Sequence, residues 1–147
     1  MGSLLEESRR FRLWQDAGAP DVLALGHGAE WESNYPHWEA LYESVRQRLR
    51  ATDILSESER FELLYVLARD NEDEQVADIL AGAPAAVNQL IPAIFDYPDP
   101  DARWQFAIIL PLALGVSAMG YLQRLLQDDN EYVRRRAHAA VDRLLGE

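Results

Sequence analysis

Glycine and proline divide this chain into segments whose apolar residues recur at helical spacing. The two residue types cluster in 18–36, 82–84, 92–100 and 111–120. After the first cluster, an i, i+3, i+4, i+7, i+11 series predicts an amphipathic helix over 37–50. The members of this series are Trp38, Leu41, Tyr42, Val45 and Leu49. No stretch alternates apolar and polar residues with the β-branched enrichment typical of a strand. We therefore expect an all-α fold.

The other helices are indicated by their first turns and apolar faces. Ser56 and Glu59 have the spacing of a capping box, which opens a helix. One face of that helix should hold Phe61, Leu64, Tyr65 and Ala68. Further helices are expected at 73–81, from Pro84 towards Phe95, at 101–114, at 118–127 and at 130–145. The glycine-containing stretch 18–35 is expected to be a loop.

Prolines and capping residues set the expected helix ends. Pro92 should kink or divide the helix that contains it, and Pro111 should bend the next one. Asp99 followed by Pro100 has the form of an N-cap with proline at the first helical position. Ser117 is a candidate cap for the helix at 118–127. Asp128 and Glu131 form a second capping-box pattern.

Residues 126–134 repeat the pattern of residues 95–103, thirty-one positions earlier. In each copy an apolar residue ends one helix, an acidic turn follows, and a small apolar residue and an arginine open the next helix. The arginines are Arg103 and Arg134. We expect each of them to reach acids in its own turn or in the neighbouring turn. Because one helix pair buries only one face alone, stacking of pairs would bury both.

A set of apolar, acidic and basic positions in the last helix pair matches a known repeat pattern: Leu122, Leu125, Leu126, Asp128, Val133, Arg134, Ala137, Ala140 and Leu144. This pattern resembles HEAT-like repeats of the short bacterial type that is also found in phycobilin lyase proteins. The resemblance covers about 118–145 well and 85–114 moderately. It implies an α-α superhelix of stacked antiparallel helix pairs, and it specifies no ligand. An irregular helical bundle is the alternative.

The length of 147 residues fits a single domain over 1–147. In this interpretation residues 1–50 form a less regular N-terminal helical cap with the loop 18–36, and residues 51–147 form the HEAT-like helix pairs. Residues 57–81 would be a third pair, although they lack the arginine.

The formal net charge is −11, and residues 51–80 alone carry nine acids against two arginines. Nucleic-acid affinity depends largely on cations that neutralise phosphates, so an acidic surface disfavours nucleic acid as a partner. The same surface would speed encounter with a basic protein. The alternative is that the acids only improve solubility.

Composition also bears on the compartment. No cysteine occurs, which excludes disulfides, thiolate metal sites and cysteine nucleophiles. The N-terminal residues mix five charged side chains with apolar ones and show no secretory h-region. The longest apolar stretch, 106–114, is too short to span a membrane. We expect a cytoplasmic protein that binds no membrane. Arginine supplies all fourteen basic residues, which is typical of a GC-rich bacterial genome.

The sequence holds no strong catalytic or cofactor motif. Gly26-His27-Gly28 lacks the strand and lysine of a phosphate loop and is interpreted as a turn. His27, Glu30, Glu32 and His37 lack a helical i, i+4 ligand pair, so metal binding is disfavoured. No serine lies in a G-x-S-x-G elbow. We therefore expect no cofactor and no enzyme. HEAT-like DNA glycosylases exist, but they resemble strongly basic repeat proteins. This chain departs from them in the sign of its charge, so nucleic-acid chemistry is disfavoured.

Candidate partner-binding residues come from three regions. Trp31 and Tyr35 lie in the acidic loop, and tryptophan and tyrosine are enriched at binding hot spots. A run of acids at a turn supplies Asp70, Glu72, Asp73, Glu74 and Asp78. The second helices of the pairs, over 72–81, 101–110 and 131–143, would line the concave face of a solenoid. From these we select Asp101, Trp104, Glu131 and Arg135, with Trp104 on the exposed side.

These features favour a non-catalytic module that binds another protein. A narrower hypothesis is an immunity or antitoxin-like inhibitor of a basic bacterial toxin, because an acidic partner would neutralise a toxin that attacks nucleic acid. The alternative is a scaffold or chaperone-like adaptor, related in role to the phycobilin lyase proteins.

Overall fold

Every regular element in the described part of the chain is a helix. The computed structural model describes residues 2–17, 35–51 and 53–146, and in these ranges α-helices are joined by turns and a 3₁₀-helix. The all-α class expected from the sequence is confirmed for these ranges. The predicted loop over 18–36 lies almost entirely outside them.

The helices are close to their predicted bounds. In chain order they are α1 (Leu4–Asp16), α2 (Trp38–Arg50), α3 (Glu57–Arg69), α4 (Gln75–Ala81), α5 (Pro84–Ile94), α6 (Pro100–Leu114), the 3₁₀-helix η2 (Gly115–Ala118), α7 (Met119–Leu125) and α8 (Glu131–Leu144). The predicted helices at 37–50, 101–114 and 130–145 each agree with the structure to within one residue at either end.

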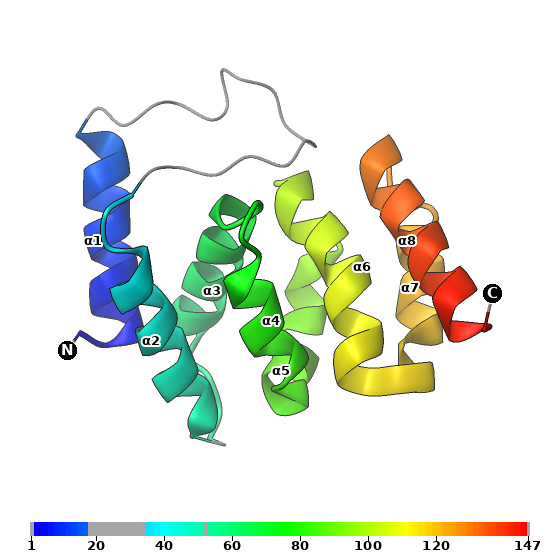
Figure 1. The fold of residues 1–147 in the computed structure, drawn as a ribbon, viewed down its shortest axis with the longest axis horizontal. Helices are drawn as coiled ribbons and strands as arrows, with labels where there is room; N and C mark the ends of the chain where they lie inside the picture. Colours follow the sequence, from blue (N-terminus) through cyan, green and yellow to red (C-terminus); the bar gives the residue numbers. More distant parts are fainter. Residues whose placement is uncertain (1, 18–34, 52, 147) are drawn as a thin grey trace.

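The helices lie in two layers (Figure 1). The even-numbered helices α2, α4, α6 and α8 form the near layer of this view, and α1, α3, α5 and α7 lie behind them. Within the near layer each helix contacts the next, and α1 contacts α3, which contacts α5. Successive helices run in opposite directions and also contact each other in pairs. Helices α1 to α6 and α8 therefore have neighbours along their own layer and in the other one, and α7 packs on α6 and α8.

Helix α6 is the centre of the core. It contacts α3, α4, α5, α7 and α8. Its buried residues occupy all sides of the helix: Asp101, Ala102, Arg103, Trp104, Gln105, Phe106, Ala107, Ile109 and Leu110. The helices that surround α6 produce this burial, and its buried polar side chains are hydrogen-bonded within the fold.

One stretch of the described residues is long and apolar enough to cross a membrane. It runs over Pro100–Leu125, and 39% of its most apolar window is buried inside the fold. It consists of α6, η2 and α7, and α7 folds back against α6. The core helix of a soluble protein passes the same test of length and composition.

The two repeat arginines make the same backbone contact. The Arg103 Nη1 donates to the Tyr97 carbonyl oxygen at 2.6 Å, and the Arg134 Nη1 donates to the Asp128 carbonyl oxygen at 2.7 Å. Each acceptor lies six residues before its arginine, so both copies close their turns alike. Arg103 also reaches the next turn, where its Nε donates to Asp128 Oδ2 at 2.8 Å. The contact to a neighbouring turn expected for the repeat arginine is confirmed at Arg103.

Several predicted helix ends differ from the observed ones. Pro92 lies in the last turn of α5 and does not divide it, because the helix ends two residues later and few hydrogen bonds remain to be lost. Ser117 lies within η2, and no side chain caps α7. The capping box predicted at Asp128 and Glu131 is wrong. The N-cap of α8 is Asn130, whose Oδ1 accepts from the Val133 amide at 3.1 Å.

The sequence analysis expected a helical N-terminal cap over 1–50 but gave no bounds for α1, although the signal for its first turn is present. The Ser3 hydroxyl accepts from the Glu6 amide at 3.2 Å, and the Glu6 carboxylate accepts from the Ser3 amide at 3.1 Å. This is a complete capping box, as at Ser56 and Glu59 of α3. Phe11 on α1 is fully buried, so the helix belongs to the core.

Candidate protein-binding groove

Tyr35 is a core residue and not an interface residue. Its side chain is buried, and its ring lies 4.9 Å from the Phe11 ring and 5.1 Å from the Trp14 ring, centroid to centroid. The exposed position expected for Tyr35 is wrong, because helix α1 packs over it, and the sequence did not show where the N-terminal helical region packs. Trp31, the other aromatic candidate of this loop, lies outside the described residues.

Asp70 and Asp101 are buried acids that hold turns together. Asp70 accepts from the Tyr42 hydroxyl at 2.7 Å and from the Val76 amide at 2.8 Å. Asp101 accepts from the Asn71 side-chain amide at 3.2 Å, which joins the turn before α4 to the start of α6. Both carboxylates are buried and accept hydrogen bonds inside the protein, so the prediction that they contact a partner is wrong.

Trp104 lies in the interior. It is fully buried, and its Nε1 donates to Asp101 Oδ1 at 3.0 Å. The Tyr132 ring meets it edge-on at 5.3 Å, and the Arg136 guanidinium lies 4.9 Å from its ring. The exposed position expected for Trp104 is therefore wrong. Helix α8 covers the side of α6 that the pattern assigned to solvent.

The remaining candidates lie at the surface. Glu72, Asp73 and Asp78 are exposed, and Glu74 is half-buried in a left-handed conformation with φ of 55°. Glu131 and Arg135 are exposed and form an ion pair of 3.3 Å within α8. None of these six residues lines the largest groove. The structure therefore spreads the surviving candidates over one side and does not gather them into a pocket.

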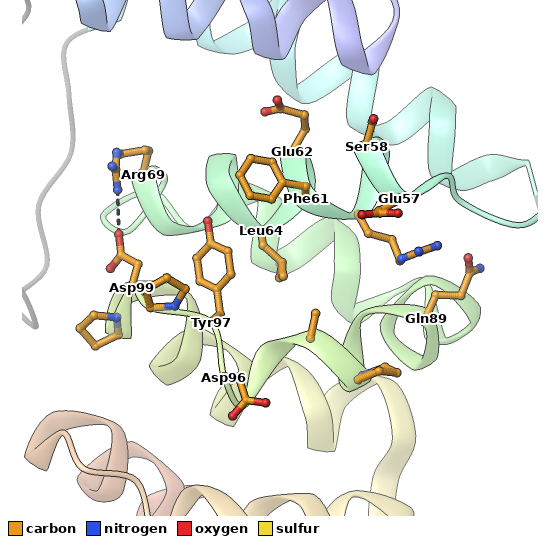
Figure 2. A pocket seen from close by; sticks show the side chains of 15 residues that line it. Glu57, Ser58, Phe61, Glu62, Leu64, Arg69, Gln89, Asp96, Tyr97 and Asp99 are labelled. Atoms are coloured by element: carbon orange, nitrogen blue, oxygen red, sulfur yellow. Dashed lines mark hydrogen bonds and ion pairs between the residues drawn. The ribbon is translucent and has the colours of Figure 1, made fainter.

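The largest groove lies between α3 and α5, in the layer of first helices (Figure 2). Its volume is about 1460 Å³. Apolar side chains dominate it, and the central ones are Phe61 and Leu64 from α3 and Tyr97 from the turn after α5. The Pro92 ring and two further prolines of the 98–100 turn complete the apolar part. Sequence reasoning placed the binding face on the second helices, so it missed this groove.

Phe61 is the most exposed aromatic residue of the groove. It lies on the same side of α3 as Leu64, yet 56% of its surface is exposed while Leu64 is buried. The Arg12 guanidinium lies 5.3 Å from the Phe61 ring. Contiguous exposed apolar surface is typical of binding sites, and the Phe61 ring adjoins the apolar centre of the groove. The sequence analysis put Phe61 on the apolar face of α3 beside Leu64, and helical spacing alone did not show that its ring, in the second turn, stays exposed.

The groove is acidic at its edges. Four carboxylates line it against two guanidinium groups: Glu57, Glu62, Asp96, Asp99, Arg60 and Arg69. Glu62 is paired with Arg12 at 3.0 Å, and Asp99 is paired with Arg69 at 2.8 Å. Glu57 and Asp96 form no ion pair with any described residue, and both are exposed. They provide two negative charges at separate sites on the rim (Figure 2).

Tyr97 brings a hydroxyl group into the apolar part of the groove. Burial, and then the nearby Asp99 carboxylate, raise the pKa of Tyr97 to about 12. The hydroxyl therefore stays protonated at neutral pH. It makes no hydrogen bond to a described residue, so it can donate to a carbonyl group of a bound chain.

Neither a family model, nor a curated protein, nor a solved structure matches this chain. Within 2–17, 35–51 and 53–146, no three histidine, aspartate or glutamate side chains are grouped as a metal site would require. Of the proposed metal cluster only His37 falls in these ranges.

Two smaller hollows lie elsewhere on the molecule. One, of about 480 Å³, is formed by α6 and α8 on the layer of second helices, and it includes Arg136 and Arg143. The other, of about 690 Å³, lies between the turns before α6 and α8 and includes Arg103 and Arg124. The first contains two arginines against one glutamate, and the second contains two arginines against three aspartates. Both are smaller than the α3–α5 groove.

Proposed function

We propose that this chain is a non-catalytic module that binds a basic protein. The supporting observation is that most of its arginine side chains already contact groups of the chain itself. Eight of the fourteen arginines pair with carboxylates of the chain itself: Arg10, Arg12, Arg46, Arg48, Arg50, Arg69, Arg103 and Arg135. Arg60 and Arg134 donate to backbone carbonyls, and Arg124 and Arg136 lie over aromatic rings.

Several acids at the surface have no arginine of the described residues beside them. Glu72, Asp73 and Asp78 are exposed and form no ion pair with a described residue, as is true of Glu57 and Asp96 in the groove. A partner therefore meets a field set by the surplus acids, because most of the cations are occupied. Such a field accelerates the encounter with a basic protein and opposes nucleic acid.

The arrangement of the helices is consistent with a short HEAT-like superhelix, which we include in the proposal. Two layers of antiparallel helix pairs and the matching contacts of Arg103 and Arg134 support it. Repeat proteins of this kind bind partners through extended surfaces and need no moving part. In its narrower form the proposal is an inhibitor of a basic bacterial toxin, working in the cytoplasm.

The test is to isolate the protein that co-purifies with the full chain from native cells and to measure the association rate of the two purified proteins. We expect the partner to be basic, and its association rate to fall about tenfold between low and high salt. An acidic partner, or an association rate that does not change with salt, would contradict the proposal. For the inhibitor form, the partner's own activity should disappear in the equimolar complex.

An adaptor that handles a pigment protein predicts a different result. A linear tetrapyrrole titrated into the protein would then change its absorption spectrum on binding. The charge distribution gives no support to that alternative, because the proposed ligand carries carboxylates of its own. A saturable spectral change would nevertheless favour it over the basic partner.

A further inference from the structure

We infer that the groove between α3 and α5 is the docking site for an amphipathic segment of the basic partner, with one large apolar side chain held between two cationic ones. The inference rests on the proposed function and adds the place and the chemistry of recognition. Its observations are the apolar centre of the groove, the two unpaired carboxylates on its rim and the hydroxyl of Tyr97.

The apolar centre selects the anchor. Phe61, Leu64 and Tyr97 face the same space from α3 and from the turn after α5 (Figure 2). An exposed aromatic ring already placed by the fold loses little conformational entropy when a partner covers it. Burial of one leucine or phenylalanine side chain against these residues supplies the central contact that binding hot spots require.

The rim selects the charges that flank the anchor. Glu57 projects from the first turn of α3, and Asp96 lies in the turn after α5, so they border the apolar centre at different points (Figure 2). Glu62 and Asp99 are already neutralised by Arg12 and Arg69. Glu57 and Asp96 are therefore the carboxylates that an incoming lysine or arginine can pair with.

Other occupants fit the charges less well. A second copy of this chain would bring a net charge of −11 towards the same acids. Residues 18–34 of the chain itself contain Asp21, Glu30 and Glu32 and no arginine, so they lack the cations that the rim selects. A basic segment from another protein is the occupant that complements both the apolar centre and the rim.

The test uses three short synthetic peptides and fluorescence anisotropy with the full chain. The first peptide carries one phenylalanine between arginines, the second replaces the phenylalanine with glycine, and the third replaces the arginines with glutamates. We expect the first to bind about tenfold more tightly than either of the others, because it alone satisfies both the centre and the rim.

Variants locate the binding. Phe61→Ala removes the exposed ring, and Glu57→Gln with Asp96→Asn removes the rim charges. Each should weaken the first peptide about fivefold or more. Two controls make the same chemical changes elsewhere: Leu112→Ala on the exposed side of α6, and Glu72→Gln with Asp73→Asn. They should leave the affinity within about twofold. Circular dichroism checks that each variant stays folded.

Each other outcome overturns the inference. If the 72/73 control weakens binding as much as the 57/96 variant, the peptide is attracted by the acidic surface in general. If the glycine peptide binds equally well, the apolar centre is not used. If no peptide binds, the groove does not take a segment of this kind. In all three cases the proposed function survives if the native partner is basic and its association depends on salt. Failure of the docking-site inference can therefore be distinguished from failure of the proposed function. Self-association of the chain that Phe61→Ala abolishes, seen as a concentration-dependent mass, would assign the groove to a second copy.

Discussion

Arg103 connects the turn that holds Tyr97 to the turn that holds Asp128, which lies twenty-five residues after Arg103 in the sequence. Its guanidinium donates to the Tyr97 carbonyl and to both oxygens of Asp128, and only 10% of its side chain is exposed. Replacing it with glutamine leaves the nearly buried Asp128 carboxylate without its cation. We expect Arg103→Gln to lower the free energy of unfolding by about 3 kcal/mol, measured by urea denaturation.

The matched control is Arg135→Gln. Arg135 pairs with Glu131 one turn earlier on α8, and both side chains are largely exposed. Surface pairs of this kind contribute little, so the free energy of unfolding should change by less than about 0.5 kcal/mol. Equal losses in the two variants would show that the contact between turns is no stronger than a surface ion pair.

Asp128 makes stability depend on pH in the acid range. Burial alone would raise the pKa of its carboxyl, but the hydrogen bonds from Arg103 and from the Asn130 amide outweigh it, and the pKa lies below its ordinary value of 3.8. The contribution of the carboxylate is therefore complete above the ordinary pKa and is lost as the pH falls through the lowered one.

The lowered pKa of Asp128 predicts how the stability of a variant depends on pH. Between about pH 5 and about pH 2, the free energy of unfolding should fall less steeply in Asp128→Asn than in the unchanged protein. Urea unfolding at a series of pH values measures both slopes. Glu59 also has a lowered pKa, chiefly through its hydrogen bond from Arg48, so some slope should remain in the variant. Identical slopes would mean that Asp128 does not contribute.

Contacts within a few residues of chain were easier to predict from the sequence than the burial of a side chain. The arginine positions 103 and 134 followed from a pattern of acid, apolar residue and arginine, because the contact is made within a few residues of chain. The burial of Trp104 and Tyr35 did not follow, since it depends on α8 and α1 covering them from far along the sequence. Helical spacing assigns a face to a residue but not the element that covers that face.

At the scale of single helices, one of the two predicted capping boxes is confirmed. Ser56 and Glu59 were expected to open α3, and their reciprocal bonds are present, with the Ser56 hydroxyl accepting from the Glu59 amide at 3.1 Å. Ser56→Ala should lower the free energy of unfolding by about 1 kcal/mol, because the first turn of α3 loses the partner of one amide.

Ser58→Ala is the control for the cap. Ser58 is exposed inside the first turn of α3 and makes no hydrogen bond to a described residue, so the helix loses nothing when it becomes alanine. Its free energy of unfolding should be unchanged or slightly higher, since alanine is the better helix former. Chemical denaturation of both variants gives the comparison. A loss at Ser58 as large as at Ser56 would contradict a role for the cap.

Other helix ends needed the structure. Asp128 and Glu131 fit the sequence pattern of a capping box. In the structure, however, Asp128 accepts from Arg103, and Asn130 is the residue that caps α8. A local pattern cannot show that a more distant cation competes for the same carboxylate. The expected effect of Pro92 also needed the structure. That effect depends on how many turns of helix follow the proline, and in α5 only part of one turn follows it.

For the whole molecule, the class was predictable and the position of the groove was not. The all-α class follows from spacing that every segment shares. The groove depends on how far α3 stands from α5, which is set by side chains from several helices at once. The second-helix layer was chosen by analogy with other repeat proteins, and the largest hollow lies on the opposite layer.

The connections across layers also determine how the molecule unfolds. Helix α6 touches five other elements of the near and far layers, and α1 and α2 reach the rest through α3 and α4. The Arg69–Asp99 and Arg103–Asp128 pairs tie successive turns along the same edge. Loss of any one helix pair would therefore expose apolar surface of its neighbour, so we expect a single cooperative transition.

Two probes test this expectation in the unchanged protein. Tryptophan fluorescence includes Trp14 and Trp38 from the N-terminal helices, while far-ultraviolet circular dichroism reports helix content along the whole chain. Because the N-terminal pair packs on α3 and α4 through buried residues such as Phe11 and Tyr42, both signals should change at the same urea concentration with the same slope. A fluorescence transition at lower urea would show that α1 and α2 detach first. The stack would then behave as a series of units joined by nearest-neighbour contacts and not as one body.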